Sequence, residues 1–268
     1  MLNIDKIPYH CVFYRYFLCF IDFLDLKLYI SIANYFISLL NGRRTSALFI
    51  RGMHEDEALW TDYSSYIVDR YKYVQSWTGE LIELDYSKLF NNFYKLWKDE
   101  VDRNFIKSLT GWYLESNRYI EVESSIVKAQ IGLELLYNYL LIEKQGLLLD
   151  NDAHRLSAAN KIRLLLNYLQ VEFDIPKELS NLSKYLSEKN KVKDAPGIIV
   201  QIRNSLVHGE KTKREEIAKI DNKTKIEVLH LCIWYIELAI MSILKHDGFY
   251  LNRCKNGYLN QVKDSVPW

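Results

Sequence analysis

Apolar residues recur at helical spacing through most of the chain after residue 86. In segments 126–140 and 226–243 they repeat at steps of three and four, which places them on one side of a helix. Further helices are predicted over about 86–109, over 156–169 after an Asp152 cap, and over about 176–189. Successive helices with short connections are typical of an up-and-down bundle. We therefore predict a mostly α fold, an up-and-down helical bundle over residues 86–248.

The regions on either side of this bundle have a different pattern. Residues 1–85 form a short mixed region whose secondary structure the pattern leaves uncertain. Their apolar segment 11–40 is interrupted by charges, and its longest uncharged run, 28–42, falls short of the ~20 residues that a membrane-spanning helix needs. We predict that this segment is core or partner-facing, with a membrane-linked effector as a remaining alternative. Residues 249–268 are aromatic and rich in turn residues, and we expect this tail to pack on the bundle.

Composition narrows the class of protein. A chain of 268 residues that is 49% hydrophobic can bury a large core, and its net charge of +1 gives no overall basic surface for nucleic acid. Its four cysteines form no Cys-x-x-Cys pair, and no signal peptide is evident, so a reducing cytoplasmic location is expected. We predict no metal site and no cofactor.

A short run of chemically active side chains precedes the last predicted helix. Residues 203–208 read Arg-Asn-Ser-Leu-Val-His. An arginine neutralises a phosphate, a histidine transfers a proton, and an amide orients a hydroxyl or an imidazole, so together these groups can cut RNA without a metal. Arg203, Asn204 and His208 are therefore the candidate catalytic residues.

Helical geometry predicts how these side chains are arranged. We expect a helix over 198–208 that begins after a break at Pro196-Gly197 and stops at a left-handed Gly209. Asn204 and His208 then lie four residues apart on one side, where their side chains meet and the amide can fix the histidine tautomer. A solvent-exposed histidine without a role fits the same pattern. The opposite side faces the core and consists of Ile198, Ile199, Ile202 and Leu206.

The motif lies in a basic part of the chain. Residues 184–225 contain eleven lysine and arginine residues against six aspartate and glutamate residues. Such a surface attracts phosphates, although a solvated lysine-rich loop has the same composition. No aromatic residue lies between Tyr185 and Trp234, so base stacking would come from elsewhere. The candidate RNA-binding residues follow the motif directly: Lys211, Lys213 and Arg214.

Glu134 is a candidate supporting residue. It lies close to the apolar stripe of segment 126–140, where a carboxylate needs a partner. We predict that Glu134 holds the Arg203 guanidinium, and a boundary glutamate that reaches solvent is the alternative.

Two other polar groupings have plainer interpretations. His230 and Glu237 are seven residues apart on the last predicted helix and are interpreted as surface residues. The run His54-Glu55-Asp56-Glu57 resembles an acidic metal cluster, but consecutive residues rarely converge on one ion, so a solvated loop is expected.

The residues at 203–208 fit the Arg-polar-x3-His motif of HEPN domains, helical bundles that are often metal-independent ribonucleases. The predicted helix 124–143, with Gly132-Leu133-Glu134-Leu135-Leu136, resembles the helix that pairs with that motif. The end of the chain, Gly248-Phe249-Tyr250-Leu251-Asn252-Arg253 and Val266-Pro267-Trp268, looks like large HEPN ribonucleases of the ApeA type, associated with bacterial phage defence. The resemblance covers about residues 86–268. ApeA-type proteins have a sizeable β-rich N-terminal region, whereas about 85 residues precede the bundle here.

This resemblance implies a function and a mechanism. His208 would act as general base or acid on the 2′-hydroxyl or the leaving 5′-oxygen, Arg203 would stabilise the charge on the phosphorane, and Asn204 would position the imidazole or the hydroxyl. Members of the family typically build the site across a homodimer. The expected protein is a toxin or antiviral defence effector with RNA as substrate and an antitoxin or phage-derived trigger as a further partner. A non-catalytic module that binds RNA, nucleotide or protein is the alternative.

Overall fold

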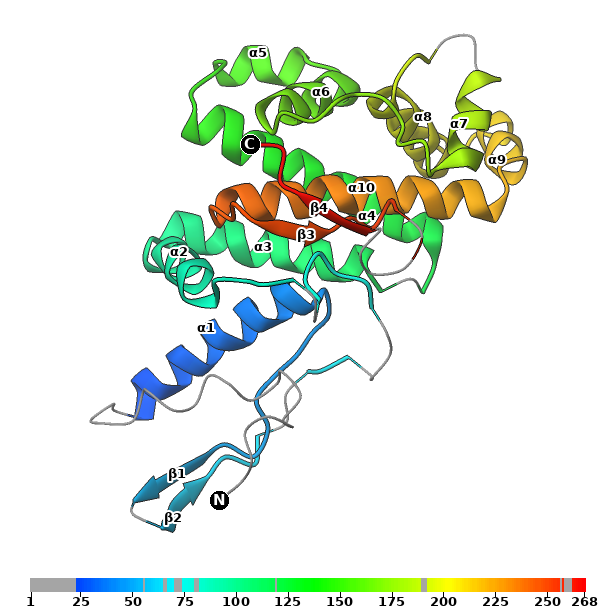
Figure 1. The fold of residues 1–268 in the computed structure, drawn as a ribbon. Helices are drawn as coiled ribbons and strands as arrows, with labels where there is room; N and C mark the ends of the chain where they lie inside the picture. Colours follow the sequence, from blue (N-terminus) through cyan, green and yellow to red (C-terminus); the bar gives the residue numbers. More distant parts are fainter. Residues whose placement is uncertain are drawn as a thin grey trace.

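Three long helices form the centre of the molecule: α3 (Glu100–Ser116), α4 (Val122–Tyr137) and α10 (Asn222–Ile243) (Figure 1). The computed structural model describes residues 23–54, 56–64, 67–69, 74–79, 82–118, 120–188, 192–255, 257 and 262–268. Within these ranges the chain is mostly helical, which confirms the predicted fold class. The core lies where the three helices meet, and its fully buried residues include Ile106, Leu109, Ile126, Leu133, Leu229 and Ile236.

The apolar stripe of segment 126–140 is buried as predicted, but the helix that carries it has two parts. α4 continues into a π-helical segment, η3 (Asn138–Lys144), after which the chain turns at Gly146. Gly146 has a φ of 61°, a left-handed conformation that glycine adopts without strain. One predicted helix over 124–143 is therefore an α-helix followed by a wider turn.

Shorter helices surround this centre. α2 (Tyr86–Lys98) precedes α3 in the chain, and α5 (Asp150–Arg155), α6 (Ala158–Tyr168) and α7 (Ser180–Ser187) follow η3. The predicted cap at Asp152 is wrong, because Asp152 lies inside α5 and the Ser157 side chain accepts the capping hydrogen bond from the Asn160 N–H of α6. α7 is also shorter than the predicted helix over 176–189.

Before α2, the regular structure of the described residues is one helix and one hairpin. α1 (Phe23–Asn41) packs on α2 and α3, and its buried residues include Ile32, Phe36 and Leu39. β1 (Arg51–His54) and β2 (Glu57–Thr61) then pair antiparallel, and Figure 1 shows this hairpin extending away from the bundle. The beginning of the apolar segment 11–40 lies outside the described residues. No group of three or more His, Cys, Asp or Glu residues suited to a metal occurs among the residues that the structure describes.

The tail crosses the central helices. β3 (Phe249–Leu251) and β4 (Lys263–Ser265) form a second antiparallel pair that lies over α10 in Figure 1. The Trp268 indole N–H donates to the His246 carbonyl at 2.9 Å. Of the helices in the described ranges, α10 alone has the length and hydropathy to cross a membrane, and 67% of its most apolar stretch is buried inside the bundle, as in a core helix.

Candidate active site

Helix α8 (Ala195–Val207) carries the predicted motif. It begins earlier than predicted, because Pro196 and Gly197 form its first turn instead of a break before it, a position that proline tolerates. Asp194 caps the helix by accepting the Gly197 N–H at 2.9 Å. Arg163 of α6 binds both oxygens of Asp194, at 2.7 and 2.9 Å. Partial burial alone would raise the pKa of Asp194, but the bonds from Arg163 and Gly197 outweigh it and lower that pKa.

The predicted core side of this helix is confirmed in its main part. Ile198, Ile199 and Ile202 are buried, and Leu206 is half-buried. The Gln130 side chain of α4 donates to the Ile199 carbonyl at 2.7 Å, so α8 is joined to the central helices by a buried hydrogen bond as well as by apolar contacts.

The end of the helix differs from the prediction. α8 ends at Val207, and His208 is the capping residue, with extended backbone angles (φ −83°, ψ 114°). Gly209 does not adopt the predicted left-handed conformation. His208 therefore leaves the helix, and its side chain is exposed.

The amide of the motif binds the arginine and not the histidine. Arg203 Nη1 donates to Asn204 Oδ1 at 3.2 Å. The predicted side-chain contact between Asn204 and His208 does not form, because His208 lies outside the helical turn, and only its backbone N–H reaches the Asn204 carbonyl, at 3.1 Å. Arg203 Nε is buried without a hydrogen-bond partner, and no carboxylate of the described residues pairs with Arg203 or His208.

The predicted pair between Glu134 and Arg203 is wrong. Glu134 Oε1 accepts from Lys161 Nζ of α6 at 2.7 Å, because α6 packs on α4 directly beside it. The Glu134 side chain is 52% exposed, which agrees with the alternative of a boundary glutamate. Both residues nevertheless line one hollow of about 90 Å³ between α4, α6 and α8. Its lining consists of Gln130, Ile131, Leu133, Glu134, Ala158, Lys161, Ile162 and Arg203.

The predicted RNA-binding residues begin a short helix, α9 (Lys211–Ala218). Ser205 Oγ of α8 donates to Glu216 Oε2 at 2.8 Å, which holds α9 against the motif helix. Lys213 pairs with Glu216 at 3.1 Å and Lys211 with Glu215 at 3.9 Å. Arg214 Nη1 donates to the Gly209 carbonyl. The basic residues are therefore next to the motif, as expected, but local acceptors bind all three.

The interpretation of Glu237 as a surface residue is wrong, and His230, on the same helix, is half-buried. Glu237 is fully buried and pairs with Arg253, which is also fully buried, through Arg253 Nε at 2.8 Å and through Nη2. The Tyr113 hydroxyl donates to the same carboxylate at 2.8 Å. Burial, with a smaller contribution from Arg253, lowers the pKa of His230 to about 4. The available signal was that α10 is apolar on nearly all sides after Glu227, so a glutamate at position 237 is buried whichever way it points.

Comparison with known families identifies the larger part of the chain. Residues 99–264 match the family described as the YopA C-terminal domain. The chain belongs to this family. A second match, to the family described as the YopA central domain, covers residues 21–74. The YopA C-terminal domain match includes α3 to α10 and therefore Glu134, the motif, α9 and the buried pair of Glu237 and Arg253.

One curated relative of the chain is a Bacillus subtilis (strain 168) protein called "SPbeta prophage-derived uncharacterized protein YopA". The two are 26% identical over 234 residues, which is 87% of this chain and 51% of the relative. The chain thus spans about half the length of that relative. No solved structure matches the chain.

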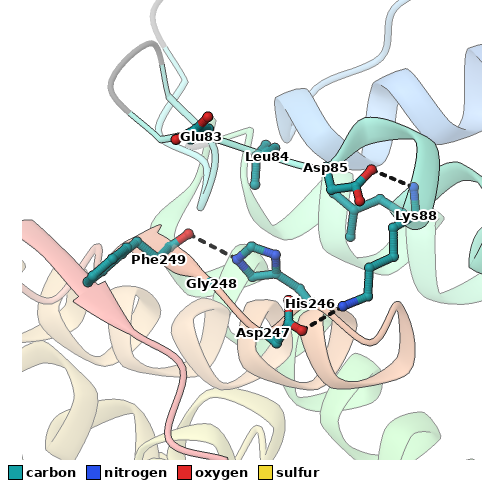
Figure 2. Close-up of a pocket in the computed structure, with 9 residues that line it drawn as sticks. Glu83, Leu84, Asp85, Lys88, His246, Asp247, Gly248 and Phe249 are labelled. Atoms are coloured by element: carbon teal, nitrogen blue, oxygen red, sulfur yellow. Dashed lines mark hydrogen bonds and ion pairs between the residues drawn. The ribbon is translucent and has the colours of Figure 1, made fainter.

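The YopA C-terminal domain also borders a larger hollow, of about 400 Å³, where the end of α10 meets α2 (Figure 2). Lys88 of α2 pairs with Asp247 at 2.7 Å, and the His246 ring contacts the Phe249 carbonyl through Nε2 at 2.9 Å. Asp85 accepts the Lys88 backbone N–H as the cap of α2. These contacts join the tail to α2, and no residue of the motif lines this hollow.

Proposed function

We propose that this protein is a HEPN-type, metal-independent endoribonuclease that acts in the cytoplasm as a toxin or a phage-defence effector. The observation that carries the proposal is the state of the motif residues. Arg203 and His208 lie at one end of α8 without a carboxylate partner among the described residues, whereas the three cations of α9 that follow have local acceptors. A cation without a counter-ion is available to a phosphate.

The chemistry assigned to these groups is a phosphoryl transfer within the RNA. One imidazole takes the proton of a 2′-hydroxyl, and the 2′-oxygen attacks the adjacent phosphorus. The bond to the 5′-oxygen breaks, and a second imidazole gives that oxygen a proton. The products are a 2′,3′-cyclic phosphate and a 5′-hydroxyl. Arg203 stabilises the charge that develops on the phosphorane, and Asn204 holds the guanidinium.

This mechanism needs an acid and a base, and each chain contributes one motif histidine. We therefore propose that two copies of the chain place two His208 side chains at one cleft. Val207 supports this arrangement, because this branched apolar residue is 48% exposed directly beside His208. The similarity to a protein named as prophage-derived is compatible with a role in conflict between phage and host.

The test is cleavage of a labelled single-stranded RNA by the purified full chain in EDTA. We expect cleavage with 2′,3′-cyclic phosphate ends, and a loss of about 10²–10⁴-fold in His208→Ala. His154→Ala is the matched control, because His154 is an exposed histidine on α5 outside the motif. Cleavage that survives His208→Ala, or that disappears in EDTA, would refute the proposal.

A second candidate is a non-catalytic module that binds RNA, nucleotide or protein. The pairing of Lys211 and Lys213 with glutamates favours it, since it reduces the positive charge beside the motif. RNA binding that weakens steeply with salt, without any cleavage, would support this second function.

A further inference from the structure

The hollow between α4, α6 and α8 contains a second cation besides the motif arginine. Lys161 reaches it from α6, and its side chain is only 12% exposed. Its ammonium also lies 5.6 Å from the centre of the Tyr137 ring. Enclosing the Lys161 ammonium to this extent removes part of its hydration, which is unfavourable. The ion pair with the Glu134 carboxylate offsets this loss.

The size of the hollow limits what it can hold. Its volume of about 90 Å³ is far below the roughly 300–1,000 Å³ of pockets that enclose a drug-sized ligand. It accepts a few waters or one small tetrahedral group, and not a whole nucleoside. The charges of Arg203, Lys161 and Glu134 leave an excess of one positive charge in it.

The donors in the hollow are not saturated. An arginine has five N–H donors, and Arg203 uses Nη1 on Asn204 while its Nε has no partner. The Lys161 ammonium has three donors and gives one to Glu134. The Arg203 guanidinium and the Lys161 ammonium, which both line the hollow, therefore keep N–H donors from which an oxyanion can accept.

We propose that this hollow binds one backbone phosphate of single-stranded RNA, with Lys161 as a second phosphate-binding residue beside Arg203. Glu134 is a positioning residue that holds the ammonium at the edge of the hollow when no phosphate is bound. The assignment of the phosphate to RNA rests on the proposed function, whereas oxyanion binding by the two cations does not require cleavage. Ile131, which is 37% exposed, forms part of the rim.

The experiment separates binding from cleavage by working in the full-length His208→Ala background. Anisotropy of a fluorescent single-stranded RNA is measured as a function of salt. We expect Lys161→Ala to weaken binding about tenfold, as for the loss of one hydrogen bond to a charged group. The slope of log K against log[salt] should become shallower by about 0.7, the value for one phosphate contact on a single strand.

Further variants exclude a merely structural role. Lys161→Arg should restore most of the affinity, and Glu134→Gln should leave it unchanged or raise it, because it removes a negative charge. Lys225→Ala is the matched control, since Lys225 forms an equally enclosed pair with Glu123, also at 2.7 Å, but lies outside the hollow. If Lys161→Ala binds RNA like its parent, or if Lys225→Ala weakens binding equally, the inference is wrong.

Two arms identify the source of the phosphate and keep the two proposals apart. Inorganic phosphate and AMP are added as competitors, and competition by AMP at concentrations as low as those of RNA would overturn the assignment to an RNA backbone.

If His208-dependent cleavage persists while Lys161→Ala changes neither binding nor slope, this inference fails and the proposed function stands. If binding depends on Lys161 but no cleavage occurs, the ribonuclease proposal fails instead.

Discussion

Removing one partner of the buried ion pair between Glu237 and Arg253 should destabilise the protein more than removing both. Both side chains have no exposed surface. Arg253→Met leaves the Glu237 carboxylate in the core with the Tyr113 hydroxyl as a donor. Glu237→Leu leaves a buried guanidinium whose other acceptors include the Asn117 amide oxygen and the Gln75 carbonyl. An uncompensated buried charge of this kind costs about 3–5 kcal/mol.

The double variant Glu237→Leu/Arg253→Met removes both charges together. Replacing a buried pair by apolar side chains is often neutral or stabilising, and here the lost bonds to Asn117 and Gln75 reduce that gain. We therefore expect the double variant to cost less than either single variant, with a coupling energy of several kcal/mol in the double-mutant cycle. For a domain of this size each 1 kcal/mol lowers Tm by about 2–4 °C, so each single variant should melt roughly 6–20 °C below the parent.

The assay is urea denaturation followed by far-UV circular dichroism, with thermal melting as a second measurement. Lys88→Ala is the control, because it breaks an ion pair with Asp247 that is solvent-exposed and therefore contributes little to stability. Single variants as mild as Lys88→Ala, or a double variant that costs the sum of the two singles, would refute the argument that the two charges compensate each other in the core.

Two further predictions concern pH and assembly. Because the pKa of His230 is lowered to about 4 in the folded state and is near 6.5 when unfolded, the unfolded state binds more protons below pH 6.5. The contribution of neutral His230 to the free energy of unfolding should therefore be fully present above pH 6.5 and should be lost as the pH falls toward 4. In a denaturation series over this pH range, the free energy of unfolding of His230→Gln should decrease less than that of the parent. An identical pH profile in the variant would contradict this prediction. Val207→Lys should convert the proposed dimer to a monomer in light scattering and reduce RNA cleavage with it, whereas a monomeric parent protein would contradict the dimer.

Patterns within one helix were predictable from the sequence, because a helix repeats its environment every three to four residues. The stripe of segment 126–140 and the core side of α8 are buried as their spacing indicates.

Helix ends were less predictable. Asp194 two residues before Pro196 is a signal for the start of α8, since a capping aspartate and a first-turn proline occur together at helix starts.

Partners between helices were not predictable, because the spacing of residues does not say which helix lies beside which. From the sequence, either Arg203 or Lys161 could be the cationic partner of Glu134, depending on which helix packs beside α4. In the structure α6 packs on α4, and therefore Lys161 is the partner. The buried hydrogen-bond network around Glu237 was unpredictable for the same reason. Its carboxylate, Glu237, is joined to Tyr113, which is 124 residues away in the chain.

Helix α4 connects the core to the motif. The Gln130 side chain, which is 8% exposed, donates to the Ile199 carbonyl of α8, and in an α-helix this carbonyl also accepts the backbone N–H four residues later, that of Arg203. One turn further along α4, Glu134 holds Lys161 of α6. The helix that carries Arg203 and the Lys161 ammonium are therefore both hydrogen-bonded to α4, which also packs against α10. A rigid helix limits the positions that a guanidinium can adopt better than a loop does, and a site that stabilises a developing charge depends on that restriction.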